Sequence, residues 1–131
     1  MNLALIFACL PLLGAAAIRT GLLPPQQECQ ARLVVRQQGD MLAVVGQCLN
    51  VSSQPLNLSY ELKMDKTGSA GTSRNSQSGR FTIASHQTLA LSQTTIRVDP
   101  TDYYRVRLRL LDEQGRIVAQ DSLLYTPKGK P

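Results

Sequence analysis

The clearest pattern in the chain is the alternation of apolar and polar residues over positions 56–65. The apolar side chains of this stretch fall on every second residue, at Leu56, Leu58, Tyr60, Leu62 and Met64. A period of two is typical of a strand with one face on a core and the other in water. Residues 67–79 then contain no large aliphatic side chain, and Phe81 resumes the apolar pattern. We therefore expect a half-buried strand followed by a polar, weakly paired connection.

Further segments of the chain have the composition of strands and are separated by turn residues. They cover residues 29–36, 41–50, 80–84, 88–98, 103–111 and 116–126. The pattern of 88–98 becomes irregular near Ser92 and Gln93, which indicates a β-bulge. Residues 103–111 alternate again, so we expect Tyr104, Val106, Leu108 and Leu110 to point inward.

This arrangement predicts the fold class. About seven short strands at regular spacing, with no helical periodicity after the N-terminal segment, favour an all-β, immunoglobulin-like antiparallel β-sandwich. The chain has no Trp, and Cys29 and Cys48 are close in sequence, so it differs from an antibody-type domain. A small β-barrel is the structural alternative.

The first 17 residues are apolar almost throughout and end in small residues, as a secretory signal peptide does. A membrane anchor is the competing interpretation, but the run is shorter than the roughly 20 residues of a membrane span and contains Pro11. We expect cleavage after residue 17 and no stable membrane association afterwards. An extended leader (18–27), the β-sandwich domain (28–127) and a basic tail (128–131) follow.

The cysteines provide a second constraint. A hairpin of 29–36 and 41–50, closed by a four-residue loop at 37–40, aligns the apolar faces of the two strands. This register places Cys29 directly opposite Cys48. Cys9 leaves with the signal peptide, and an even number of cysteines in an exported protein indicates a disulfide. We predict a Cys29–Cys48 bridge.

The sequence offers no catalytic or metal-binding set. Ser85 and His86 lie in a predicted turn, without an acid or oxyanion site that the sequence specifies. The acidic residues near strand ends also lie in turns, where Asp is favoured because it caps the backbone. Two thiols and one remote histidine do not suit zinc. We expect a protein that is not an enzyme and needs no cofactor.

The charge balance draws attention to one strand. The chain carries 14 basic and 9 acidic residues, a net charge of +5. Arg105, Arg107 and Arg109, here called the arginine row, lie about 7 Å apart on one face of a strand, and Tyr103 shares that face. We predict that this row with Tyr103 binds a client. The alternative is that Glu61 or Asp65 on a neighbouring strand neutralises it. A nucleic-acid site would interleave more aromatic residues, so we expect no nucleic-acid partner.

Three segments of the chain resemble the periplasmic curli chaperones, the CsgH proteins and their CsgC relatives. They are residues 29–33 (CQARL), residues 58–62 (LSYEL) and above all residues 66–81. The last of these is similar to the family's Gly/Ser-rich segment that ends in Ser-Gln-x-Gly-x-Phe. The Cys-x-Cys of CsgC-type members is missing, so the resemblance does not extend to redox activity.

The resemblance implies an immunoglobulin-like sandwich in the periplasm, and we expect this protein to be a monomer. Such a chaperone keeps curlin-type amyloid subunits from forming fibres before export. An alternative from another class is a structural or adhesin-type component of a surface fibre that uses strand-edge interactions.

Overall fold

The computed structural model describes residues 27–127, which contain seven strands. They are β1 (Cys29–Gln38), β2 (Met41–Asn50), β3 (Leu56–Gly68), β4 (Gly71–Ile83), β5 (Thr88–Arg97), β6 (Tyr103–Leu111) and β7 (Ile117–Tyr125). The predicted signal peptide, the leader up to residue 26 and the basic tail lie outside the described residues. Within residues 27–127 we find no helix with the length and apolar character needed to cross a membrane.

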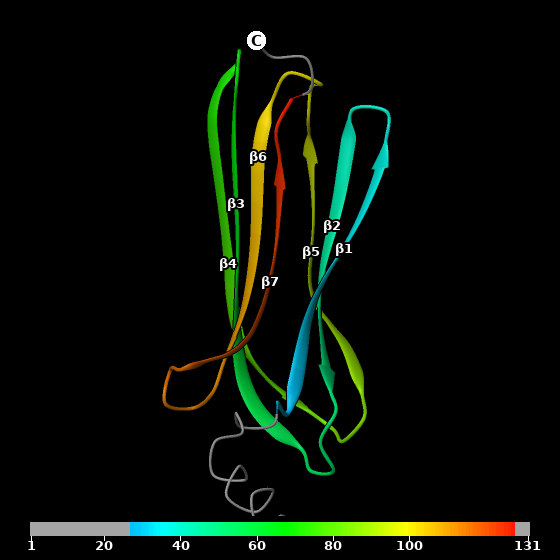
Figure 1. The fold of residues 1–131 in the computed structure, drawn as a ribbon, viewed down its shortest axis with the longest axis vertical. Coiled ribbons are helices and arrows are strands. Elements are labelled where there is room, and N and C mark those ends of the chain that lie inside the picture. Colours follow the sequence, from blue (N-terminus) through cyan, green and yellow to red (C-terminus); the bar gives the residue numbers. More distant parts are fainter. Residues whose placement is uncertain (1–26, 128–131) are drawn as a thin grey trace, which may run out of the picture.

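The strands form two antiparallel sheets that face each other (Figure 1). One sheet has the order β1-β2-β5 and the other has the order β4-β3-β6-β7. In immunoglobulin terms, β1, β2 and β5 take the places of strands A, B and E, and β3, β6 and β7 those of C, F and G. β4 pairs with β3 and so takes the place of C′. The all-β sandwich that the sequence predicted is confirmed.

The core lies between the sheets and is aliphatic, as a chain without Trp requires. It is filled mainly by the even-numbered residues of β2, β3 and β6, each of which has one face inward. The fully buried side chains among them include Leu42, Val44, Leu62, Val106, Leu108 and Leu110. The inward residues predicted for 103–111 are all buried. The predicted bulge is also present, because Gly46 faces Ser92 while Gln47 faces Ala90.

The register of the β1–β2 hairpin differs from the one predicted. Gln38 pairs with Met41, so the loop contains two residues rather than four. Gly39 occupies the first loop position with φ 58°, a conformation that favours glycine in tight hairpins. Cys29 therefore lies opposite Asn50, and Cys48 lies opposite Ala31. The shift is an even number of residues, so every side chain keeps its predicted face.

The expectation of a polar connection at 67–79, followed by a short strand at 80–84, was wrong. These residues belong to β3, a tight turn and a single long strand, β4, which pairs with β3 without interruption from Gly68–Gly71 to Leu56–Ile83. Residues Gly71–Ser76 are all exposed. β4 needs few apolar side chains because it is an edge strand whose first half lies in solvent, while β3 satisfies one side of its backbone.

The structure also explains why the polar segment ends in Gly-x-Phe. Gly79 lies directly opposite Tyr60 of β3. A Cβ atom at residue 79 would lie 3.2 Å from Cε1 of the Tyr60 ring, so the aromatic ring covers this position closely. Phe81 packs beside the same ring at a centroid distance of 6.4 Å. Two of the three sequence segments that carry the family resemblance, residues 58–62 and 66–81, therefore pack against each other.

A buried asparagine, Asn50, lies at the end of β2, where the connection to β3 begins. The Nδ2 atom of Asn50 donates hydrogen bonds to the carbonyl oxygens of Gln54, Ile83 and Ala84, at 2.8–3.2 Å. Its Oδ1 atom accepts hydrogen bonds from the backbone N–H and the hydroxyl of Ser52. The side chain is fully buried, and its hydrogen bonds join the β2–β3 connection to the end of β4.

Replacing Asn50 with Ala should lower the free energy of unfolding by about 3 kcal/mol, because it leaves buried carbonyl groups without a donor. Urea denaturation measures this change. Asn57→Ala is the matched control, since Asn57 is exposed and, within residues 27–127, its side chain only accepts a hydrogen bond from the Thr82 hydroxyl. It should change stability by less than about 0.5 kcal/mol. Equal effects of the two substitutions would contradict the role assigned to Asn50.

Candidate binding face

The arginine row lies on the outer face of the four-stranded sheet, as predicted. Its residues alternate with the buried Tyr104, Val106, Leu108 and Leu110 of β6. Arg105 is exposed, whereas Arg107 and Arg109 are half-buried. Because β6 is a central strand between β3 and β7, the row runs along the middle of this face rather than along its edge.

Both acidic residues that the sequence named as alternative partners contact the row. Glu61 lies 4.0 Å from Nη1 of Arg109, and Asp65 lies 3.7 Å from Nη2 of Arg107. Asp65 is directly opposite Arg105 in the β3–β6 register, but among residues 27–127 Arg105 forms no ion pair. The second ion pair of Asp65 is with Nε of Arg74 on β4, at 3.8 Å. The acids therefore neutralise part of the row and leave Arg105 free.

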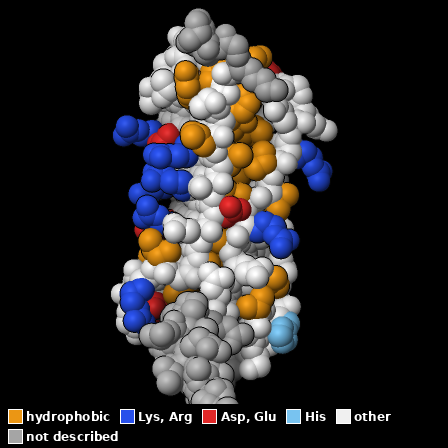
Figure 2. All heavy atoms as spheres, in the orientation of Figure 1, with side chains coloured by type: hydrophobic (Ala, Val, Ile, Leu, Met, Phe, Trp, Pro, Cys, Tyr) orange, Lys and Arg blue, Asp and Glu red, His pale blue; other side chains and the backbone are white. Residues whose placement is uncertain are grey.

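Cations outnumber acids across the whole outer face. The registers of β3 with β4 and β6 place six Lys or Arg side chains on this face against two acids, Glu61 and Asp65. The cationic residues are Lys63, Arg74, Arg80, Arg105, Arg107 and Arg109. In Figure 2, Lys and Arg side chains gather along the side of the molecule where Figure 1 places β3, β4 and β6. Such a surface attracts anionic or polar partners.

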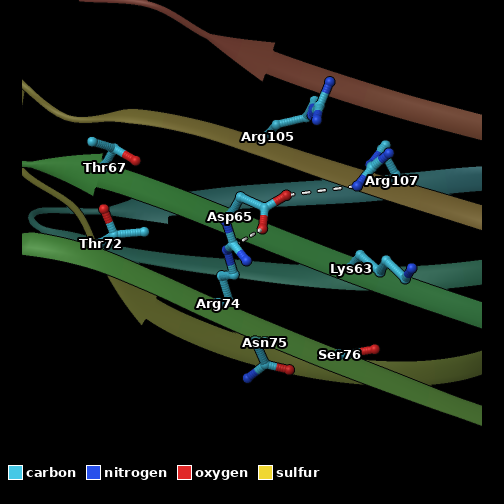
Figure 3. A pocket seen from close by; sticks show the side chains of 9 residues that line it. All are labelled: Lys63, Asp65, Thr67, Thr72, Arg74, Asn75, Ser76, Arg105 and Arg107. Atoms are coloured by element: carbon cyan, nitrogen blue, oxygen red, sulfur yellow. Dashed lines mark ion pairs between the residues drawn. The ribbon is translucent and has the colours of Figure 1, made fainter.

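Part of this face is hollowed (Figure 3). A depression of about 580 Å³ is lined by charged residues of β3, β4 and β6 and by hydroxyl and amide side chains. The charged residues are Lys63, Asp65, Arg74, Arg105 and Arg107. Figure 3 shows Asp65 between Arg74 and Arg107, with Arg105 on the same strand as Arg107. The hollow can accept a carboxylate or amide group between guanidinium groups.

Two exposed apolar side chains lie beside Arg105. Tyr103 precedes it on the same face of β6 and is 45% exposed, while Leu124 on β7 is directly opposite it and is 66% exposed. A free guanidinium group flanked by an aromatic ring and an aliphatic side chain combines charge attraction with apolar contact. This arrangement makes Arg105 the centre of the candidate binding face.

Four residues of this face were not predicted from the sequence. Arg74 and Arg80 were assigned to a connection and a short strand, so their alignment beside Asp65 and Ser59 was not visible. Lys63 was correctly placed on the polar face of its strand, but that face had not been matched to the arginine row. Leu124 was missed because the inward face of the last strand had not been assigned.

The Ser85–His86 turn has a structural role. The Ser85 hydroxyl donates a hydrogen bond to the carbonyl oxygen of Ser52 at 2.7 Å. His86 adopts a left-handed conformation with φ 62° in the turn that Gln87 closes onto Ala84. In the part of the chain that the structure describes, no group of three or more His, Cys, Asp or Glu residues is placed to hold a metal ion.

The two cysteines are neighbours in the core but are not bonded in the structure. Both are buried, and they occupy diagonal positions on the inward face of the β1–β2 hairpin. A hydrogen bond with Cys29, together with burial, raises the pKa of the Cys48 thiol, which stays protonated at neutral pH. The direct cross-strand pairing that the sequence predicted is therefore wrong, while the disulfide itself stays a prediction.

We expect mature protein from an oxidising compartment to have no free thiol after denaturation, because the two buried thiols are neighbours in the core. A Cys29–Cys48 bridge closes a loop of about 20 residues, which should add about 3 kcal/mol to the free energy of unfolding in the chain-entropy model. Thiol titration in denaturant tests the bridge. Reduced protein is the control, and its two buried thiols should react only after unfolding. Two free thiols in oxidised material would contradict the prediction.

The fold and the face together define a class: a small two-sheet β-sandwich with one strongly basic sheet face. The sequence model of the family described as CsgH protein matches residues 37–118, more than half of the chain. The chain therefore belongs to the CsgH protein family. A search of curated proteins found no match.

Comparison with solved structures agrees with this assignment. The E. coli curli protein CsgC is 20% identical and superposes with a TM-score of 0.62, over 72% of this chain and 96% of its own. The solution structure of R. palustris CsgH is 27% identical with a TM-score of 0.57, over 73% of this chain and 91% of its own. A domain of Bacteroides uniformis beta-glucuronidase 2 also superposes, at 13% identity with a TM-score of 0.55 over 14% of that enzyme, and shows only a shared fold.

Proposed function

We propose that this protein is a periplasmic, non-enzymatic chaperone that binds curlin-type amyloid subunits and delays their assembly into fibres. The observation that carries the proposal is the basic outer face of β3, β4 and β6 in a member of the CsgH family. The protein acts as a monomer after its signal peptide is removed, and it needs no cofactor.

The physical basis is the contrast between a rigid sheet and a disordered client. An amyloid precursor is hazardous because its extended segments pair edge to edge. A sheet face with six cations holds acidic and amide side chains of such a chain by many weak contacts, without a deep pocket. Weak, fast binding is sufficient because it needs only to disfavour the rare nucleus from which a fibre grows.

Charge also speeds the encounter. Complementary potentials raise association rates, and this effect falls with ionic strength because exposed charges are screened over about 10 Å at 0.1 M salt. Within the arginine row, Arg105 contributes most to this attraction, since Arg107 and Arg109 already have acidic neighbours. Exposed ion pairs of that kind add only about 0–1 kcal/mol each to stability, so the row contributes little to folding.

Changing Arg105, Arg107 and Arg109 together to Gln should shorten the lag that the native protein imposes on fibre formation. We expect the native domain to extend this lag below an equimolar ratio to the subunit, and to do so less as salt rises. Thioflavin fluorescence of a curlin-type subunit measures the lag. Arg105→Gln alone should have a larger effect than Arg109→Gln alone, because Arg109 is paired with Glu61.

The matched control changes Arg32, Arg36 and Arg97 to Gln, which removes the same charge from the three-stranded sheet. This variant should retain inhibition, and both triple variants should unfold within about 1 kcal/mol of the native protein. Full, salt-insensitive activity of the arginine-row variant would exclude the row as the binding surface. A native domain without effect on any such subunit would favour the structural-fibre alternative.

A further inference from the structure

We propose that the free edge of β4 binds an extended segment of the client by strand addition. The inference rests on the proposed function and specifies the contact that follows electrostatic encounter. β4 is 13 residues long and pairs with β3 without a bulge. Along such a strand, every second residue directs its N–H and C=O groups away from its partner, and an added strand can bond to them.

The other sheet edges are shorter and are obstructed. β1 and β7 lie on the same side of the sandwich, where the backbone N–H of Leu33 donates to Oδ2 of Asp121 at 2.8 Å. An inward-pointing carboxylate of this kind blocks strand addition. β5 carries the bulge opposite Gly46, and its end is held by the ammonium group of Lys66, which donates to the carbonyl oxygen of Arg97 at 2.7 Å.

The side chains of β4 define the chemistry of the strand it would accept. Arg74 and Arg80 lie on the outer face, while Asn75 and Gln77 lie on the other face, opposite Met64 and Leu62 of β3. A strand paired with β4 would place its own side chains directly beside these residues. Acidic groups suit the arginine side and amide groups suit the Asn75–Gln77 side, where amide ladders form. The occupant is therefore an extended segment with carboxylates on one face and amides on the other.

The same arginines disfavour pairing of the β4 edge with a second copy of the protein. The bounds of β4 place Gln77 at its midpoint. Two β4 strands paired antiparallel along their full length would therefore set Arg74 of each copy opposite Arg80 of the other. Like charges directly opposite each other destabilise a strand pair. β4 thus disfavours self-association while it remains open to a chain of opposite charge.

A peptide of the same length as β4 tests the proposal with the mature protein. The peptide has Gln at odd positions and Thr at even positions, except Glu at the fourth and tenth positions. In either strand direction, these glutamates fall opposite Arg74 and Arg80. Its binding should slow amide hydrogen exchange in residues 71–83 and leave exchange in β1 unchanged. A second peptide with Lys in place of Glu should bind at least about tenfold more weakly, since both cross-strand pairs become repulsive.

The double variant Arg74→Glu, Arg80→Glu should reverse this preference in favour of the Lys peptide. The control Arg32→Glu, Arg36→Glu makes the same charge change on β1 and should leave the preference unchanged. An unreversed preference, or slowed exchange in another strand instead of β4, would overturn the proposal.

Self-association provides an independent measurement. The single variant Arg74→Glu creates two attractive cross-strand pairs in a full-length β4–β4 dimer. Its dimerisation, measured by sedimentation, should be at least about tenfold tighter than that of the native protein or of the double variant. Equal association of all three proteins would contradict the full-length register, in which Arg74 of each copy faces Arg80 of the other.

The edge proposal and the chaperone proposal fail in different ways. If the native protein delays fibre formation while the client leaves β4 exchange unchanged, the edge proposal is wrong and the chaperone function stands. If the Glu peptide protects β4 but the protein delays no fibre, strand addition stands and the proposed function is wrong.

Discussion

The strict alternation of side chains along the paired strands β3 and β6 is the constraint on which the rest of the structure depends. Leu62, Met64, Val106 and Leu108 fill the core only if every intervening residue points to solvent. Glu61, Lys63, Asp65 and the arginine row are thereby fixed on one outer face. The basic face is therefore inseparable from the core, because a slip of one residue would bury the arginine row and expose the leucines.

This constraint explains which features the sequence could predict. The inward faces of residues 56–65 and 103–111 and the position of the arginine row follow from a period of two. The hairpin register did not, because loops of two and four residues keep the same faces and apolar pattern cannot distinguish them. The strand β4 was missed for a different reason: its first half is exposed on both faces, so it carries no apolar alternation. Its pairing is set by the backbone and by the long strand beside it.

The two sides of the sandwich differ in whether their edge strands have a partner. Asp121 satisfies the outward N–H of Leu33 and so ties β1 to β7, which closes one side. On the other side, β4 extends beyond the core with Ser, Thr and Asn residues in water. A long polar edge in a small sandwich adds little apolar burial and exposes unpaired backbone groups. Those unpaired groups add nothing to the stability of the isolated domain, but they can bond to the strand of a partner.

The basic face and the β4 edge belong to one sheet, and Arg74 belongs to both. Its guanidinium group contacts Asp65 beside the arginine row, while its backbone lies on the free strand. A client strand added to β4 would continue the sheet and bring its acidic side chains next to Arg74 and Arg80. Long-range attraction, which salt screens, and short-range backbone bonding, which salt affects little, would then act in sequence on the same segment. Charge would govern how fast the client is found, and the edge would govern how long it is held.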